Sequence, residues 1–256
     1  MKRYLLLPII VFFVSCTSSH KSKLSLKERP LYKVHKANSE LVIDGKLDDT
    51  AWEKAEGRTF DYYYLTDKEE EKQKTTFRML WDEKYLYVHY DLNDKFINAA
   101  ETKRDGAPYL DDCAELFLIP APNGENIHYC FEINPNKAIN DLVFVNDFYQ
   151  GQNVAIRAFN PDFKLEVAIN GTLNNNSDID KGWSLEMAIP HETFNAVSNE
   201  FPIKKGSQWA FLALKQIRDD ENIGRRVMST LFPVENVKEK DVHQPSMFGL
   251  LEFVDQ

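Results

Sequence analysis

The residues best suited to chemistry lie close together in the middle of the chain. Tyr109 precedes an acidic pair in a loop, and Glu115 follows in a stretch whose apolar residues predict a strand over residues 113–119. In that strand Glu115 shares a face with apolar residues, where a carboxylate is costly unless it is paired or meets a ligand. Glu132 and Asn134 share one face of the next predicted strand. These side chains form the candidate site.

This combination of residue types suits a sugar. Sugar rings present apolar C–H faces and polar rims, so they bind to a flat aromatic ring with carboxylates and amides around it. Tyr109 suits the role of that ring, and packing of Tyr109 on the sheet edge is the alternative. Glu115 and Glu132 could instead cleave a glycosidic bond as acid and base, at separations of about 5–5.5 Å or 6.5–9.5 Å. A glycan hydrolase or lyase is therefore the alternative function.

No cofactor is assigned from the sequence. The Asp-rich stretches at residues 44–49 and 174–180 could hold calcium, although neither has the spacing of an EF-hand. Met79 and His89 raise the question of a heme-carrying electron-transfer domain. Isolated residues of these types usually pack or face solvent, and the chain has no CxxCH attachment motif, so the sequence disfavours heme. GxSxG, HExxH, Walker and dinucleotide-binding motifs are also absent from the sequence.

Strands must position these side chains. The chain has 256 residues, of which 43% are hydrophobic and 12% aromatic, with only 10 glycines. Short helical turns are expected only near residues 51–55 and 191–195. Strands are predicted at residues 75–81, 85–90, 113–119, 128–133, 138–145, 154–159, 163–169, 183–189, 209–217 and 248–253. Many short strands with one or two short helices predict an all-β fold, an antiparallel β-sandwich formed by one domain over residues 32–256.

The four tryptophans and two of the cysteines are predicted to have structural roles. All four tryptophans lie in patterned segments, where core packing is expected. Cys113 and Cys130 lie on consecutive predicted strands, where a disulfide is geometrically awkward, so two packed thiols are expected. The net charge is −9, from 40 acidic and 31 basic residues, and an acidic surface repels phosphate backbones. Nucleic acid is therefore excluded as a partner.

The first residues of the chain predict export and anchoring. A basic start and an apolar run over residues 5–14 are typical of a signal peptide, here residues 1–15, and the run is too short to span a bilayer. The segment Phe13-Val14-Ser15-Cys16 resembles the bacterial lipobox, which implies that Cys16 is acylated. Residues 16–31 are polar and predict a flexible tether. We therefore expect a lipid-anchored protein of the outer membrane in the cell envelope, on either its periplasmic or its surface face.

Six segments resemble, in order, the motifs of carbohydrate-binding module family 9. This family has a DOMON-like β-sandwich, of the immunoglobulin or jelly-roll kind. The segments are LVIDGKLDDTAW (41–52), WDEKYLYV (81–88), DCAELF (112–117), FEINP (131–135), GWSLEMAIP (182–190) and QPSMFG (244–249). The resemblance covers the whole predicted domain, and it implies non-catalytic binding of an oligo- or polysaccharide. With the lipid anchor, it implies a role in polysaccharide capture or uptake beside other glycan-uptake proteins.

The resemblance also implies roles for individual residues. Family members clamp a terminal sugar between two aromatic rings, and Tyr109 stands at the first of these positions. Val242 stands at the second, where the aromatic residue is lost and His243 is the ring nearby. Glu115 and Asn134 match ligand-binding positions of the family.

Glu132 departs from the family pattern. Family members often carry an arginine at this position, which hydrogen-bonds to sugar hydroxyls. A glutamate can still accept such bonds, but the exchange predicts a different ligand. The predicted ligand-binding set is therefore Tyr109, Glu115, Glu132, Asn134 and His243.

Overall fold

The computed structural model describes residues 26–122, 127–145, 154–195, 201–218 and 226–255, and their fold is all-β. The single α-helix among them is α1 (Val237–Lys240), and the 3₁₀ turns are η1 (Leu26–Glu28), η2 (Thr50–Lys54), η3 (Glu69–Glu71), η4 (Pro108–Leu110), η6 (His191–Phe194) and η7 (Pro245–Met247). The strands are β1 (Leu31–Lys36), β2 (Arg58–Thr59), β3 (Tyr62–Tyr64), β4 (Thr75–Trp81), β5 (Tyr85–Asn93), β6 (Cys113–Ile119), β7 (Ile127–Ile133), β8 (Ile139–Val145), β9 (Val154–Ile156), β10 (Lys164–Asn170), β11 (Gly182–Pro190), β12 (Gln208–Arg218), β13 (Arg226–Thr230) and β14 (Gly249–Val254).

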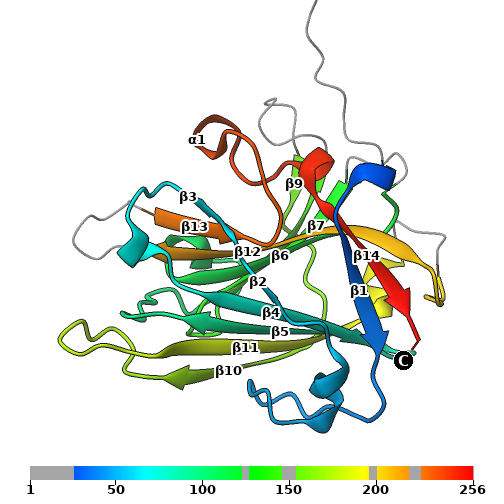
Figure 1. The fold of residues 1–256 in the computed structure, drawn as a ribbon, viewed down its shortest axis with the longest axis horizontal. Coiled ribbons are helices and arrows are strands. Elements are labelled where there is room, and N and C mark those ends of the chain that lie inside the picture. Colours follow the sequence, from blue (N-terminus) through cyan, green and yellow to red (C-terminus); the bar gives the residue numbers. More distant parts are fainter. Residues whose placement is uncertain (1–25, 123–126, 146–153, 196–200, 219–225, 256) are drawn as a thin grey trace, which may run out of the picture.

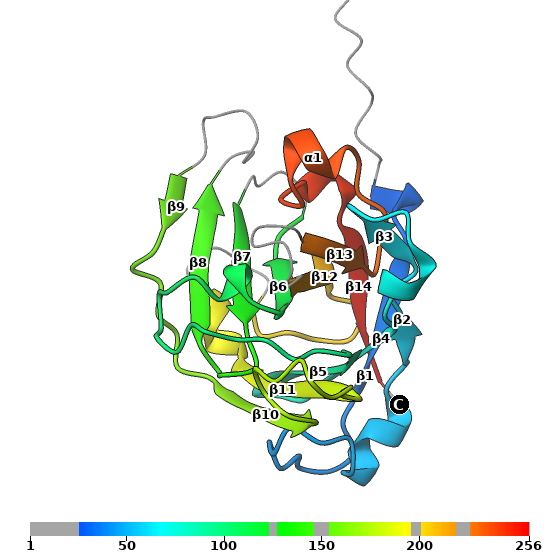
Figure 2. The same cartoon turned by 90° about the vertical axis from the view of Figure 1, so that its left-hand side faces the viewer.

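The strands form one curled sheet. Its main path runs β10-β11-β5-β4-β1-β14-β12-β6-β7-β8-β9, with β2, β3 and β13 attached at its side. In Figure 2, β10, β11 and β5 lie at the base of the view and β6 to β9 rise above them. The curl encloses a large core, in which Phe77 of β4 stacks on Phe211 of β12 at 6.0 Å between ring centres. Segments far apart in sequence thus share one core.

The sheet is mixed, which corrects the prediction of a purely antiparallel arrangement. β1 pairs in parallel with both β14 and β4, so Leu31 lies opposite Leu250 and His35 opposite Leu80. Figure 1 shows β1 and β14 running side by side. Parallel neighbours need a long connection between them. Nearly the whole domain separates β1 from β14, and for this reason hairpin signals did not reveal the pairing.

Most predicted elements are present. Each of the ten predicted strands overlaps an observed strand, whereas β1, β2, β3 and β13 were missed. The four tryptophans are buried, with exposed fractions of 0–4%, as predicted. Cys113 and Cys130 are buried free thiols, also as predicted. None of the described helices is long and apolar enough to cross a membrane.

The described structure includes residues before residue 32. η1 lies within the predicted tether, and Arg29 donates hydrogen bonds to the carbonyl oxygens of Pro245 (3.2 Å) and Phe248 (3.3 Å). Leu26 packs against the core. The predicted signal peptide and Cys16 lie outside the described residues.

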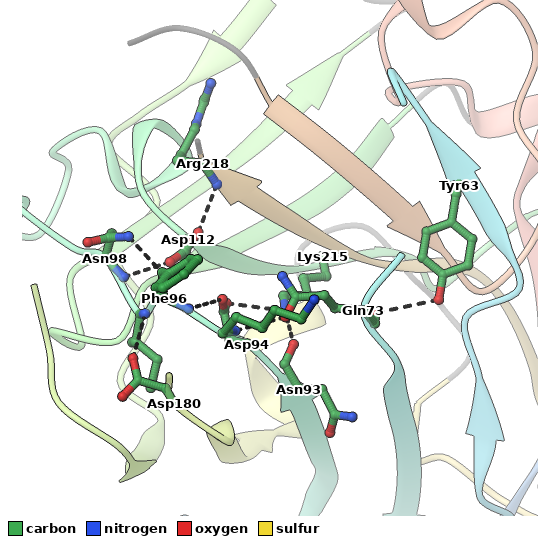
Figure 3. Close-up of polar contacts among 12 residues, drawn as sticks. Tyr63, Gln73, Asn93, Asp94, Phe96, Asn98, Asp112, Asp180, Lys215 and Arg218 are labelled. Atoms are coloured by element: carbon green, nitrogen blue, oxygen red, sulfur yellow. Dashed lines mark hydrogen bonds and ion pairs between the residues drawn. The ribbon is translucent and has the colours of Figure 1, made fainter. Parts of the chain in front are cut away.

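Buried carboxylates hold the long connection between β5 and β6 (Figure 3). Asp94 forms an ion pair with Lys215 of β12 at 3.2 Å, and both side chains are fully buried. Asp112, at the other end of the connection, accepts hydrogen bonds from the backbone N–H groups of Asn98 (2.6 Å) and Arg218 (2.8 Å). The connection carries η4, and thus Tyr109, so this network positions one wall of the candidate site.

Candidate functional site

A cavity of about 240 Å³ is lined by side chains of β6, β7, β8 and β12. Its walls also include η4, β13 and the segment at residues 241–243, directly after α1. Four of the five predicted ligand-binding residues line it, namely Tyr109, Glu115, Glu132 and His243. The structure thus brings together residues that are separated by more than a hundred positions.

Glu115 and Glu132 form the floor of this cavity as a cross-strand pair. They lie directly opposite each other in the antiparallel register of β6 and β7. Their exposed fractions are only 1% and 5%. On opposed positions of an antiparallel pair the Cβ atoms are about 4.5–5.5 Å apart, so the two carboxylates are close neighbours.

Neutral amide groups satisfy both carboxylates. Gln216 of β12 donates its side-chain N–H to Oε1 of Glu115. Asn140 of β8 donates to Oε2 of Glu132 at 2.6 Å, and the thiol of Cys130 donates to Oε1 at 3.3 Å. Neither carboxylate forms a salt bridge within the part of the chain that the structure describes.

Each of these amides also accepts a hydrogen bond from an arginine. Arg226 donates to Oε1 of Gln216 at 3.3 Å and also to Asp241 at 3.3 Å. Arg157 donates to Oδ1 of Asn140 at 3.3 Å. Because arginine can only donate, each amide must turn its oxygen toward the arginine and its NH₂ group toward the carboxylate. The hydrogen-bonding network therefore fixes the orientation of both amides.

The carboxyl pair favours its protonated form. Burial raises the pKa of Glu132 to about 7, against the opposing hydrogen bonds from Asn140 and Cys130. Burial, and next the charge of Glu132, raise the pKa of Glu115 well above its usual value. Two anions at this separation in a low-dielectric site repel strongly, so a proton held at the pair is stabilising.

Tyr109, the predicted stacking residue, lines the cavity. It lies in η4, where its ring is half-buried, and Arg218 donates a hydrogen bond to its backbone oxygen. Val242, at the lost second clamp position, is buried and lines the cavity. A cavity-lining aromatic that sequence reasoning missed is Phe144 of β8. Its place in an apolar strand segment carried no signal that distinguished it from a core residue.

The imidazole ring of His243 lines the cavity and is neutral. Its Nδ1 lies 3.0 Å from Nε2 of the fully buried His128, and its ring stacks on Phe117 at 4.5 Å. Burial lowers the pKa of His243 to about 3. Burial, and next the neighbouring His243, lower the pKa of His128 well below its usual value. His243 therefore contributes a hydrogen-bonding ring without charge.

Asn134, also predicted as a ligand residue, does not line this cavity. Its Nδ2 donates to Oδ2 of Asp111 (2.7 Å) and to the backbone oxygen of Glu101 (2.9 Å), and its Oδ1 accepts from the N–H of Ala138 (2.9 Å). All of its hydrogen-bonding groups are used, and the side chain is fully buried. Asn134 therefore fastens the loop before η4.

The acidic loops considered for calcium use their oxygens internally. Asp180 accepts hydrogen bonds from the backbone N–H groups of Ile97 (3.0 Å) and Thr172 (2.7 Å), and Asn174 accepts from Ala99 (2.8 Å). Asp44 accepts from both the backbone and the side chain of Lys46. Within the described residues, no group of three or more His, Cys, Asp or Glu side chains is placed to bind a metal ion.

The two residues considered for heme lie on opposite faces of the sheet. Met79 is opposite Val88 in the β4–β5 register, whereas His89 is opposite Arg78. Side chains of successive strand residues point to opposite faces, so Met79 and His89 cannot share one iron.

Comparison with known proteins identifies similar chains. The family model described as carbohydrate family 9 binding domain-like matches residues 43–256. Over 77 residues, the chain is 36% identical to exoglucanase XynX of Acetivibrio thermocellus and 35% identical to endo-1,4-beta-xylanase A of Thermoanaerobacterium saccharolyticum. Each match spans 30% of this chain but only 6% of the enzyme, so the chain corresponds to a small part of these relatives.

Two solved structures share the fold. A family 9 carbohydrate-binding module from Caldicellulosiruptor kristjanssonii, in complex with cellotriose, aligns with a TM-score of 0.60 at 19% identity, covering 88% of this chain and 94% of that one. A protein from Bacteroides uniformis aligns with a TM-score of 0.67 at 18% identity, covering 88% and 99%.

Proposed function

Since the chain belongs to the carbohydrate family 9 binding domain-like family, we propose that it binds an oligo- or polysaccharide, without cleaving it, in the cavity floored by Glu115 and Glu132. The observation that carries the proposal is the convergence of a rim tyrosine, two carboxylates and two oriented amides on one small cavity. Such a set offers a stacking face together with donors and acceptors for hydroxyl groups.

The dimensions of the cavity favour the end of a glycan. At about 240 Å³ it is below the usual range of small-molecule pockets, which begins near 300 Å³. A single sugar unit at a chain end suits this volume better than a long internal stretch. The solved structure of the Caldicellulosiruptor module with cellotriose supports a saccharide as the ligand.

We expect weak binding, because only one clamp ring is retained. Tyr109 supplies one aromatic face, whereas the small Val242 stands at the second clamp position. Loss of one stacking ring removes about 1–3 kcal/mol, by analogy with base stacking on aromatic side chains.

The test begins with a glycan array on residues 26–256, followed by calorimetric titration of the best ligand. Tyr109→Ala is expected to weaken binding about tenfold to hundredfold. Glu115→Gln, which retains the size of the side chain, is expected to weaken binding about tenfold, because an acceptor oxygen on the cavity floor is replaced by an NH₂ donor. Both variants should keep a cooperative melting transition.

Tyr62→Ala is the matched control, since Tyr62 is 42% exposed on β3 and lies outside the cavity lining. Unchanged binding by both site variants would place the site elsewhere. Shorter glycans on a chromatogram after incubation would show catalysis, and would instead support a hydrolase or lyase that uses Glu115 and Glu132.

We also propose a specific fold type and domain extent for the chain. We assign the chain to the DOMON-like sandwiches of the immunoglobulin or jelly-roll kind, as one domain that reaches residue 256. The curled sheet around one main core and the structural alignments support this assignment.

We further propose that Cys16 is acylated and anchors the protein in the outer membrane, where it serves polysaccharide capture or uptake. The lipobox-like segment that ends at Cys16 supports the anchor. Mass spectrometry of the membrane fraction should find a mature chain that begins at Cys16 and carries two or three acyl chains. Cys16→Ser should release the protein from the membrane fraction. A wild-type mature chain without lipid would contradict the anchor and leave glycan binding unaffected.

A further inference from the structure

Among the described residues, the carboxyl pair on the cavity floor has no ion-pair partner. Glu115 and Glu132 are opposed across β6 and β7, and both are more than nine-tenths buried. Like charges at opposed positions of a sheet destabilise it, and burial increases this cost. A site of this kind needs positive charge from elsewhere.

The charges of Arg226 and Arg157 oppose the rise in the pKa of Glu115 and of Glu132, respectively, but the hydrogen bonds that the structure shows for these arginines go to other groups. Arg226 is engaged by Gln216 and Asp241, and Arg157 by Asn140. Each arginine is therefore separated from its nearest glutamate by a neutral amide. One chain of hydrogen bonds runs from Arg226 through Gln216 to Glu115. The other runs from Arg157 through Asn140 to Glu132. The two carboxyl groups lie between these chains.

The surrounding donors also limit which cation fits. Gln216 and Asn140 turn NH₂ groups, not oxygens, toward the carboxylates, and Cys130 adds a thiol donor. Calcium and magnesium require a shell of oxygen ligands, which these groups do not provide. An ammonium group carries one positive charge and three N–H donors, and it can bridge two carboxylates that keep their amide partners.

We propose that the glycan bound in this cavity carries an unacetylated amino group, whose ammonium lies between Glu115 and Glu132. This inference rests on the proposed function, and it specifies the class of sugar. The ring of Tyr109 at the rim stacks on the sugar face, and the carboxyl pair selects the charged substituent. When no amine is bound, a proton held at the pair takes its place.

Three β-1,4-linked glucans of equal length test the inference, because they differ only at C2. They are chitosan oligomers with an amine, cello-oligosaccharides with a hydroxyl and chitin oligomers with an acetamide. Calorimetry near neutral pH should find the amine form bound about tenfold to hundredfold more tightly than the hydroxyl form, the range expected for a charge-assisted bond. The acetamide form should bind no better than the hydroxyl form.

Glu132→Gln should abolish this preference, measured as the ratio of the dissociation constants of the amine form and the cello-oligosaccharide. Glu83→Gln is the matched control, because it removes an exposed carboxylate at a distance from the cavity. If Glu83→Gln reduced the preference equally, the amine would merely be attracted to the acidic surface of the chain, and the inference would be overturned.

A measurement on the unmodified protein does not depend on any variant. Heats of binding in two buffers of different ionisation enthalpy should reveal a net release of protons on binding of the amine at a pH just below 7, because the ammonium displaces protons held at the pair. Neutral glycans should release none. The amino-sugar inference would be overturned if the cello-oligosaccharide bound as tightly as the amine form or more tightly, or if only amine-free glycans bound on the array. The proposal that the protein binds a glycan would then still hold. Failure of every glycan to bind would overturn the proposed function itself.

Discussion

Replacing Lys215 with methionine is expected to lower the free energy of unfolding by about 3–5 kcal/mol, the range measured when one partner of a buried ion pair is removed. The Lys215 ammonium lies 3.2 Å from Asp94 and also donates to the backbone oxygen of Asn93, with no exposed surface (Figure 3). Its loss leaves Asp94 uncompensated inside the protein. The charge of Asp94 already raises the pKa of the neighbouring Asp112, second to burial as a cause.

Urea denaturation at a fixed pH measures this effect. The double variant Lys215→Met/Asp94→Asn should recover part of the loss, because the orphaned charge is removed together with its partner. Lys205→Met is the surface control, since Lys205 and its partner Asp255 are 69% and 56% exposed, and it should change stability little. A loss for Lys215→Met no larger than that of the surface control would show that the buried pair contributes little.

Raising the pH from about 4.5 to about 7 is expected to destabilise the ligand-free protein through Glu132, by at most about 3 kcal/mol. The pKa of this carboxyl is higher in the folded state, so between these values the folded chain binds more protons than the unfolded chain. The free energy of unfolding therefore falls as the pH rises. The contribution is fully present below the unfolded-state pKa and is lost as the pH passes through the folded-state value near 7.

The comparison with Glu132→Gln isolates this contribution, because glutamine keeps the shape of the side chain but cannot ionise. Denaturation at about pH 5 and about pH 8 should show the variant gaining stability relative to wild type at the higher pH. A bound amino sugar should remove most of the difference, since its charge replaces the lost proton. A stability difference between the two proteins that does not change with pH would contradict a raised pKa at Glu132.

Several features could be inferred from the sequence because they are local. Alternation of apolar and polar residues predicted β4 and β5, and the turn at residues 82–84 joins them as expected. The six motif segments identified the family, which the family model confirms over residues 43–256. Glu115 drew attention as a carboxylate on an otherwise apolar strand face, and the structure places it in the cavity. Strand periodicity and motif order are properties of short segments, so they can be recognised without coordinates.

The partners of those residues were decided only by the tertiary structure. Asn134 carries the same signal as Glu132, two positions along one strand, yet Asp111 holds it outside the cavity. Gln216 reaches Glu115, and Arg226 reaches Gln216, because the strand pairings of β12 place them there. A register shift of one residue would turn every such side chain to the opposite face, and no local pattern specifies which distant strands pair. The sequence alone therefore determined ten of the described strands, the family and the central carboxylate, whereas long-range register and burial decided which groups surround that carboxylate.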